Sequence, residues 1–265
     1  MVYALRKAWS HGQKADILFS EMRCAIIADI HANMAALSAV LDDIKRRGGV
    51  EQVWCLGDIV GYGPDPHQCI EIMRRLSDVC VAGNHDRAAT GKLNLAEFNP
   101  EAAYACRWTA EQLKGEDISF LDSLPEVATR DYFTLVHGSP RQPVREYLLS
   151  ISGARENFSH FSTRFCLVGH THVPSIFRRT EGSGCSFNPL SPNIGLALGK
   201  SRMIINPGSV GQPRDGDPRA SYAILDDRVR MLRLYRVTYD ISLTQANMVK
   251  QNLPVKLVSR LSRGI

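Results

Sequence analysis

The feature that most constrains the fold of this chain is a set of five short apolar runs that each stop at histidine, aspartate or asparagine. The runs read CAIIADIH from Cys24, QVWCLGD from Gln52, VCVAGNHD from Val79, FTLVHG from Phe133 and FCLVGHTH from Phe165. Uninterrupted apolar runs of this length are typical of strands buried on both faces, as in a sheet covered by helices. We therefore expect a layered α/β fold whose strands end in polar clusters.

Helical patterns separate the first three runs. From Met34 to Arg47 the apolar residues recur at helical spacing, and two glycines that can end a helix follow. Residues 64–76 repeat this pattern. The alternation predicts right-handed βαβ units with a functional site at the carboxyl ends of the strands. Residues 94–124 predict an inserted pair of helices near the same edge.

The pattern changes after Pro174. Short segments typical of strands, with hairpin turns between them, occupy residues 175–179, 201–206, 221–227 and 228–237. Residues 181–200 are rich in Gly, Ser and Pro, which predicts a loop. Residues 241–265 alternate apolar and basic positions and predict one closing helix.

Composition narrows the class of protein. With 265 residues, the chain suits one large α/β domain. The net charge of +5 comes from lysines and arginines that are scattered along the chain, so no basic stripe indicates a nucleic-acid groove. No apolar run approaches the roughly 18 residues needed to span a membrane.

The cysteines and the N-terminal residues bear on location and domain limits. The seven cysteines lack C-x-x-C spacing and mostly lie inside apolar runs, which favours free thiols in a reducing compartment, here the cytoplasm. Residues 1–21 lack the apolar core of a signal peptide. Because Met22 opens the first strand run, we expect residues 1–21 to be an extension outside the core and residues 22–265 to form the domain.

The side chains at the strand ends form a set of potential metal ligands: Asp29, His31, Asp58, Asn84, His85, His137, His170 and His172. Parallel strands bring such ends together on one rim of a sheet. Oxygen and nitrogen donors of this kind suit Mn, Fe, Zn or Co. The set exceeds the needs of one ion, and two ions about 4 Å apart that share one carboxylate account for it better.

The order of these blocks resembles a known family. The series Asp29-x-His31, Gly57-Asp58, Gly83-Asn84-His85-Asp86, His137 and Gly169-His170-Thr171-His172 resembles the calcineurin-like metallophosphoesterase superfamily, from about Met22 to the C-terminal region. The stretches LGDIVGYGPDP, VHGSPR and NPGSVGQPRDGDPRASYAILD further resemble its bacterial branch of predicted phosphoesterases. The resemblance implies a four-layer αββα sandwich with an inserted helical segment. It also implies hydrolysis of a phosphate ester by in-line attack of a metal-bridging hydroxide.

The resemblance also implies roles for single residues. Asp29, His31 and His172 would hold a first metal ion, Asn84, His137 and His170 a second, and Asp58 would bridge both. His85 would contact the phosphoryl group and protonate the leaving oxygen. On extended segments, Asp29 with His31 and His170 with His172 would each point to one side.

For the other polar residues near the motifs, the sequence is compatible with more than one role. Asp86 either orients His85 or interacts with a helix dipole as an N-terminal carboxylate. Arg87, Arg141 and Arg214 follow motif ends, and each either grips a substrate phosphate or is a solvated surface residue. Asn33 follows the first ligands and could support them, or the substrate, by hydrogen bonding.

Two departures from the family pattern affect the expected activity. Ala32 stands where the family usually has glycine, which suits the same turn only if the backbone there avoids positive φ. Ser/Thr protein phosphatases and symmetric dinucleoside tetraphosphatases share the motif G-D-x-x-x-R-G, in which the arginine binds phosphate. Here Tyr62 occupies the position of that arginine, which disfavours a protein phosphatase. We expect a phosphodiesterase or a nucleotide or dinucleotide phosphoesterase acting on a small substrate. The alternatives are a phosphomonoesterase, a protein phosphatase and a non-catalytic scaffold that binds proteins; the oligomeric state stays open.

Overall fold

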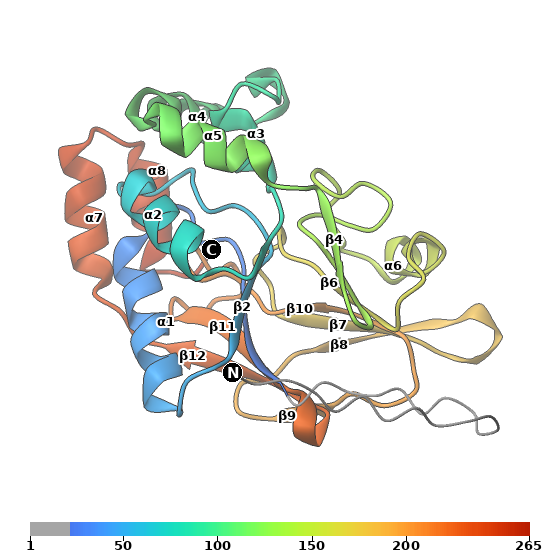
Figure 1. The fold of residues 1–265 in the computed structure, drawn as a ribbon. Coiled ribbons are helices and arrows are strands. Elements are labelled where there is room, and N and C mark those ends of the chain that lie inside the picture. Colours follow the sequence, from blue (N-terminus) through green and yellow to red (C-terminus); the bar gives the residue numbers. More distant parts are fainter. Residues whose placement is uncertain (1–21) are drawn as a thin grey trace, which may run out of the picture.

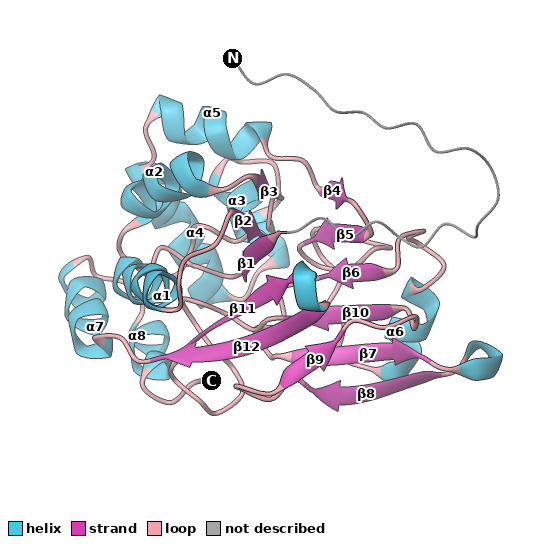
Figure 2. Cartoon of the chain, turned by 60° about the horizontal axis from the view of Figure 1, so that its bottom comes forward, coloured by secondary structure: helices cyan, strands magenta, loops and turns pink. Residues whose placement is uncertain are grey.

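Two mixed six-stranded sheets pack face to face, and helices cover their outer faces (Figures 1 and 2). The computed structural model describes residues 22–265, so the expected extension at residues 1–21 lies outside the described residues. This arrangement is the four-layer αββα sandwich that the sequence resemblance implies. Within residues 22–265, none of the helices combines the length and the apolar composition that crossing a membrane requires.

The first sheet, sheet A, has the strand order β3-β2-β1-β11-β12-β9. Its strands are β1 (Arg23–Ile27), β2 (Gln52–Cys55), β3 (Val79–Cys80), β9 (Gly195–Ala197), β11 (Ala220–Asp226) and β12 (Met231–Val237). Strands β1, β2 and β3 are parallel to one another, whereas β11 pairs antiparallel with β1 and forms a hairpin with β12. The carboxyl ends of three consecutive motif strands therefore meet at one edge.

The second sheet, sheet B, has the strand order β4-β5-β6-β10-β7-β8. Its strands are β4 (Val127–Arg130), β5 (Phe133–Val136), β6 (Phe165–Leu167), β7 (Ser175–Arg179), β8 (Cys185–Pro189) and β10 (Met203–Asn206). Strands β5, β6 and β10 are parallel. The five motif strands thus belong to two sheets rather than to one.

The helices lie in three groups. Four helices lie on the sheet A side: α1 (Met34–Arg46), α2 (Pro66–Leu76), α7 (Ile241–Lys250) and α8 (Val255–Leu261). Helix α6 (Ile151–Asn157) covers sheet B. The inserted segment is confirmed as helical and lies with α3 at one end of the molecule (Figure 1): α3 (Asn84–Ala89), α4 (Pro100–Gln112) and α5 (Gly115–Ser123). Short 3₁₀ turns occupy Leu95–Glu97, Glu181–Ser183 and Asp227–Val229.

Two sequence expectations for the later part of the chain are wrong. Residues 241–265 form two helices rather than one, because Pro254 precedes α8 as its N-cap and cannot continue α7. Residues 181–200 contain β8 and β9 rather than only a loop. Both strands lie at sheet edges and pair on one side only, so they lack the apolar pattern of a buried strand.

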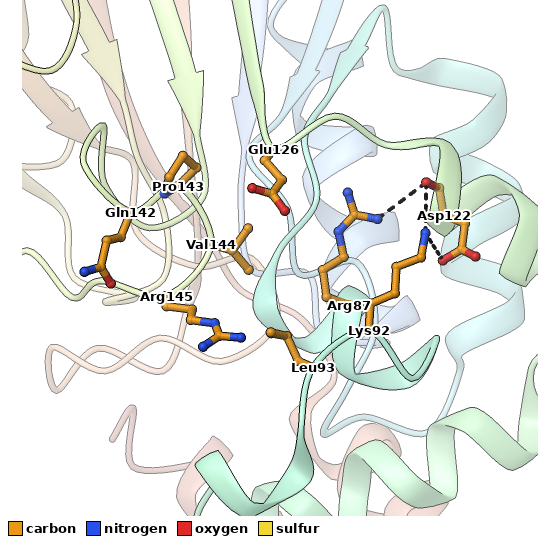
Figure 3. Close-up of a pocket in the computed structure, with 9 residues that line it drawn as sticks. All are labelled: Arg87, Lys92, Leu93, Asp122, Glu126, Gln142, Pro143, Val144 and Arg145. Atoms are coloured by element: carbon orange, nitrogen blue, oxygen red, sulfur yellow. Dashed lines mark hydrogen bonds and ion pairs between the residues drawn. The ribbon is translucent and has the colours of Figure 1, made fainter.

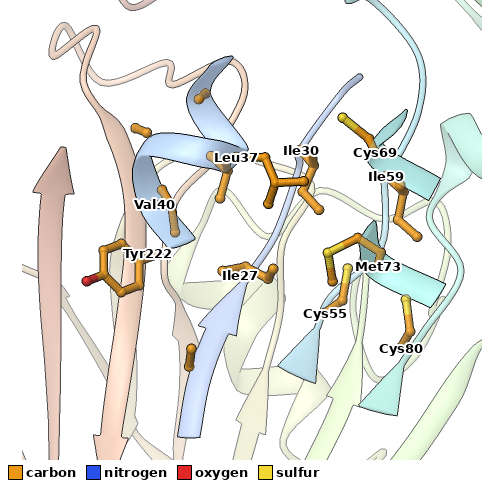
Figure 4. Packing of buried hydrophobic residues seen from close by; sticks show 14 of the residues in the cluster. Ile27, Ile30, Leu37, Val40, Cys55, Ile59, Cys69, Met73, Cys80 and Tyr222 are labelled. Carbon is orange, nitrogen blue, oxygen red and sulfur yellow. The ribbon is translucent and has the colours of Figure 1, made fainter. Parts of the chain in front are cut away.

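The uninterrupted apolar runs serve two cores at once. In β1, Ala25 and Ile27 face helices α1 and α2, whereas Cys24 and Ile26 face sheet B. Figure 4 shows the first core, where Leu37 and Val40 of α1 and Met73 of α2 pack over the sheet. Because successive side chains of a strand point to opposite faces, a strand in the middle of the sandwich must be apolar throughout.

Candidate metal centre

The structure brings the seven predicted ligands together where the two sheets meet. Six of them form two groups, and within each group the potential metal-ligating atoms lie within 4.8 Å of one another. The first group is Asp29, His31, Asp58 and His172, and the second is Asp58, His137 and His170, so Asp58 belongs to both. Asn84 places its Oδ1 3.0 Å from Nε2 of His137. All seven side chains are buried. These groups match the two ligand sets that the resemblance implies.

Hydrogen bonds to backbone carbonyls fix the orientation of the four clustered histidine rings. In three rings Nδ1 is the donor: His31 donates to the Val60 carbonyl (3.1 Å), His137 to Leu56 (2.8 Å) and His172 to Gln212 (2.6 Å). In His170 the donor is Nε2, which bonds to the Arg145 carbonyl (3.2 Å). A carbonyl oxygen can only accept, so the second nitrogen of each ring presents a lone pair when the ring is neutral, as it must be to bind a metal ion.

These lone pairs face one another across short distances. His31 Nε2 lies 3.1 Å from His172 Nε2, and His137 Nε2 lies 3.0 Å from His170 Nδ1. Two lone pairs at this separation repel unless a Lewis acid or a proton lies between them. Rings held by a carbonyl on one nitrogen, with the other nitrogen free, are typical of histidine metal ligands.

Asp58 has one carboxylate oxygen without a partner. Its Oδ1 accepts a hydrogen bond from the His85 backbone N–H (2.9 Å), whereas its buried Oδ2 has no hydrogen-bond partner among the described residues. Oδ2 lies 3.5 Å from His31 Nε2 and 3.3 Å from His137 Nε2. A buried, unpartnered carboxylate oxygen is unfavourable by itself. The donor set therefore fits divalent metal ions, with Oδ2 placed between both ligand groups.

The pKa values reflect charges that are buried without compensation in the metal-free cluster. Burial raises the pKa of Asp29 to about 7. Burial would also raise the pKa of Asp58, but the neighbouring His137 and His85 bring it well below its usual range. Burial would lower the pKa of His137, yet Asp58 raises it to about 9. Burial lowers the pKa of the other three histidine ligands, His31, His170 and His172.

The ligands stand on sharp turns and not on extended segments as expected. Five of them have left-handed φ values between 50° and 65°: Asp29, His31, Asp58, His170 and His172. Strand β1 ends at Ile27, and the chain turns away from the sheet before Asp29. Ala32 also has positive φ (49°), so the condition under which alanine would suit this turn is not met. Backbone bonds from His31 to Asp58 (2.9 Å) and from Ala32 to Ile59 (2.8 Å) hold this turn in place.

Asp86 supports the loop that carries Asp58. Its carboxylate accepts backbone N–H groups of Asp58 (2.9 Å), Val60 (3.1 Å) and Gly83 (2.9 Å). Among residues 22–265, no hydrogen bond joins Asp86 to the His85 ring. Asp86 lies in the first turn of α3. The helix-terminal alternative therefore agrees with its contacts, and the alternative in which it orients His85 does not.

His85 lies beside the cluster and packs against aromatic rings. Its ring centroid is 4.3 Å from that of Tyr62 and 5.2 Å from that of Phe98. Its Nδ1 lies 3.1 Å from Sγ of Cys106. Burial lowers the pKa of His85 to about 4, so the imidazole is neutral at pH 7.

The three arginines and Asn33 lie in different surroundings. Arg87 is buried and donates hydrogen bonds to the backbone carbonyls of Leu121, Asp122 and Leu124, at the C-terminal end of α5. Arg141 forms ion pairs with Glu146 and Glu156. Arg214 contacts Gln212 (2.9 Å) and the Tyr62 hydroxyl (3.5 Å). These contacts oppose binding of a phosphate at the metal cluster by Arg87 and Arg141, because neither residue lines the small cavity beside the ligands and both engage other protein groups.

Asn33 supports the fold around the ligands. Its Oδ1 caps α1 through Ala36 N–H (3.1 Å) and accepts from the Thr244 hydroxyl (3.0 Å). Its amide nitrogen donates to the Gly211 carbonyl (2.9 Å). Both ends of the side chain are therefore bonded within the protein, in keeping with support for the ligands.

One cavity adjoins the cluster, and a second cavity adjoins the first. The first, of about 230 Å³, is lined by Asn84, His85 and His170 and by aromatic side chains, which are Tyr62, Phe98 and Tyr147. The second, of about 460 Å³, shares Leu93 and Arg145 with the first. Figure 3 shows the larger cavity, with Arg87, Lys92 and Asp122 on one side and Gln142, Pro143 and Arg145 on the other.

Several residues that contact the site could not be predicted from the sequence. Tyr147 stacks on the His170 ring with centroids 3.6 Å apart, and Phe98 and Cys106 contact His85 from the inserted segment. They lie between motifs and have no ligand spacing. Tyr62 is the exception, since its place in the second motif marks it in the sequence.

Comparison with known proteins places this geometry in context. Residues 22–228 match the calcineurin-like phosphoesterase superfamily domain. A metallophosphoesterase from Sphaerobacter thermophilus of known crystal structure is 47% identical, with a TM-score of 0.84 over 92% of this chain and 99% of that one. An uncharacterized protein of Methanocaldococcus jannaschii is 40% identical over 251 residues, which cover 91% of this chain and 97% of the relative. A symmetrical bis(5'-nucleosyl)-tetraphosphatase of Erwinia tasmaniensis is 34% identical over 67 residues, 24% of each chain.

Proposed function

Because this chain belongs to the calcineurin-like phosphoesterase superfamily, and is thus a phosphoester hydrolase, we propose that it uses two divalent ions to cleave a phosphodiester or a nucleotide. The single observation that carries the two-ion proposal is the unpartnered Oδ2 of Asp58 between His31 and His137. An oxygen shared by two ligand groups suits a carboxylate that bridges two ions.

When bound, two divalent ions would offset the negative charge of the phosphate and provide hydroxide at neutral pH. Hydrolysis forms a P–O bond to the oxygen of water and breaks the P–O bond to the leaving group, which departs with the electron pair. His85 lines the cavity next to the ligands and is neutral at pH 7. Its N–H can donate to the leaving oxygen as negative charge develops there.

Arg214 is the arginine that we propose for substrate binding. It bonds to Gln212, whose carbonyl holds His172, and its buried Nε has no hydrogen-bond partner among the described residues. Its positive charge lowers the pKa of His172, after the larger effect of burial. A cation at this place would favour an anionic phosphate group in the cavity.

The larger cavity favours a substrate with two parts over a simple phosphomonoester. The small cavity adjoins the ligands, and the larger one continues past Arg145 and Leu93. Arg145 pairs with Glu97 (3.0 Å), and a phosphate chain could replace that carboxylate. The partial match to a dinucleoside tetraphosphatase agrees with a dinucleotide, although the match covers only 24% of this chain.

Activity with defined metals tests the proposed reaction. We expect metal-free protein supplied with Mn²⁺ to hydrolyse bis-p-nitrophenyl phosphate, and we expect Asp58→Asn or His137→Ala to lower kcat at least 10³-fold, by loss of metal catalysis. Parallel assays use Fe²⁺, Zn²⁺ and Co²⁺. Wild-type protein that binds two ions but cleaves no diester, monoester or dinucleotide would contradict the proposal and favour the scaffold alternative.

A second assay tests the two-part substrate. Arg145→Ala should raise KM for a dinucleoside polyphosphate about tenfold and affect KM for p-nitrophenyl phosphate much less, because only the former extends past Arg145 into the larger cavity. Arg155→Ala, an exposed residue of α6, is the matched control. Equal effects on both substrates would favour a phosphomonoesterase.

A further inference from the structure

The ring of His85 is held differently from the rings of the four histidine ligands. Their bonded nitrogens face backbone carbonyls, whereas Nδ1 of His85 faces the side chain of Cys106 at 3.1 Å. Cys106 lies on α4 of the inserted segment and is fully buried, and His85 is 3% exposed. A contact between these two groups therefore forms without competition from water.

The chemistry of the pair sets the direction of this hydrogen bond. Burial raises the pKa of the Cys106 thiol well above its usual range, so the group is a thiol and not a thiolate at neutral pH. A thiol sulfur is a weak acceptor, whereas an unprotonated imidazole nitrogen is a good one. The S–H therefore donates to Nδ1, and the single ring proton of neutral His85 lies on Nε2.

Neighbouring residues leave Nδ1 no alternative partner and keep the ring in place. A Cβ atom at Gly61 would lie 2.5 Å from Nδ1, so no larger residue fits at that position without displacing the ring. Tyr62 and Phe98 pack against the ring. Nε2 has no hydrogen-bond partner among residues 22–265, and His85 lines the small cavity.

We propose that Cys106 is a positioning residue that holds His85 in the tautomer with its N–H on Nε2, directed at the substrate. This inference rests on the proposed role of His85 as the donor to the leaving oxygen. Without the thiol, the neutral ring could place its proton on either nitrogen, and the fraction with an acceptor at Nε2 would oppose a negatively charged leaving group.

The tautomer can be observed directly and without any assay of activity. In Zn²⁺-loaded, ¹⁵N-histidine-labelled wild-type protein, long-range ¹H–¹⁵N spectra should show His85 as the Nε2–H tautomer, with the signal assigned by its loss in His85→Gln. In Cys106→Ala we expect a mixture of tautomers. A proton on Nδ1 in the wild-type protein would overturn the proposal, whatever the enzyme hydrolyses.

Kinetics provide the functional readout. Cys106→Ala should lower kcat about tenfold for alkyl phosphodiesters, whose leaving groups need the donor, and much less for p-nitrophenyl esters. KM and metal content should not change. Cys106→Ser retains an O–H donor and should recover most of the loss.

Cys69→Ala is the matched control, because Cys69 is a fully buried thiol of α2 that packs in the core between sheet A and its helices. It should alter stability without steepening the leaving-group dependence. If Cys106→Ala matches Cys69→Ala across all leaving groups, Cys106 is only a packing residue and the proposal fails. An inactive wild-type protein would contradict the proposed function, while the tautomer measurement would still decide the role of Cys106.

Discussion

At the scale of single residues, the site depends on backbone conformations that most side chains avoid. Five ligands and Ala32 have left-handed φ values, which disfavour each residue by about 1 kcal/mol or more relative to glycine. The surrounding hydrogen bonds enforce these values: the Asp29 carbonyl, for example, accepts from the Ser209 hydroxyl (2.8 Å) and from Gly211 N–H (2.9 Å). Strain of this kind clusters at functional sites because it turns several side chains toward one point.

Gly83, which packs against the carboxylate of Asp58, provides a test at this scale. A Cβ at Gly83 would lie 2.0 Å from Asp58 Oδ1 and 2.3 Å from Asp58 N. Gly83→Ala should therefore displace Asp58, reduce bound metal and lower the free energy of unfolding by about 2 kcal/mol or more. Metal analysis and urea unfolding measure both effects.

Gly115→Ala is the control, since a Cβ there meets no atom within 4 Å and α5 begins at this residue. It should leave metal binding unchanged. Normal metal content in Gly83→Ala would contradict the close packing of Gly83 on Asp58.

At the scale of elements, helix α3 connects the candidate metal centre to the inserted helices through side-chain hydrogen bonds. Asp86 in its first turn holds the loop of Asp58, and Arg87 holds the C-terminal end of α5. Short helices of this kind have little stability of their own, so these side-chain bonds to backbone groups determine their position. Asp86 and Arg87 are the two residues after His85, and neither forms a hydrogen bond to a metal-ligating atom of the predicted ligands.

The role of Arg87 can be measured by substitution. Arg87→Ala should lower the free energy of unfolding by about 2 kcal/mol, because it removes the donor for three backbone carbonyls near the end of α5. KM for p-nitrophenyl phosphate should not change, because this substrate does not reach the larger cavity that Arg87 lines. Arg141→Ala is the comparison: its ion pairs are solvent-exposed, and its effect on stability should stay below about 1 kcal/mol. A raised KM without lost stability in either variant would restore the substrate-binding interpretation.

At the scale of the whole molecule, the ligands join the two sheets. Asp29 and Asp58 follow strands of sheet A, whereas His137 and His170 follow strands of sheet B. A metal ion bound to both sets would therefore link the sheets and stabilise the folded state, since the unfolded chain lacks the site.

This link should depend on pH. Metal ions must displace protons from Asp29, whose pKa is raised to about 7, and from His137, whose pKa is raised to about 9. The rise in melting temperature on adding Mn²⁺ should accordingly grow from pH 6 to pH 8. In metal-free protein, Asp29 lowers stability as pH rises from 3.8 toward 7. Histidines whose pKa values are lowered raise it, and because they are more numerous they should dominate near pH 6: His31, His85, His170 and His172.

Calorimetric melting with and without metal measures both trends. Titration in buffers of different ionisation enthalpy counts the protons released. A metal-induced shift that is the same at pH 6 and pH 8 would contradict these proton-binding assignments.

The amino-acid sequence by itself determined which side chains form the centre. The runs from Cys24, Gln52, Val79, Phe133 and Phe165 mark buried strands, and residues at the carboxyl ends of parallel strands of one sheet lie along a common edge. The helices over 34–46 and 66–76 follow from local periodicity in the same way. Such features depend on nearest neighbours in the chain, so they can be predicted without knowing how the layers pack.

Only the tertiary structure decided how these side chains are used. The division of the ligands between two sheets, the unpartnered Oδ2 of Asp58 and the left-handed turns depend on how the sheets pack together. The contact of Cys106 with His85 joins residues 21 positions apart, and the bond of His172 to Gln212 joins residues 40 apart. Partners of this kind are set by the placement of whole helices and loops, for which the local sequence carries no signal.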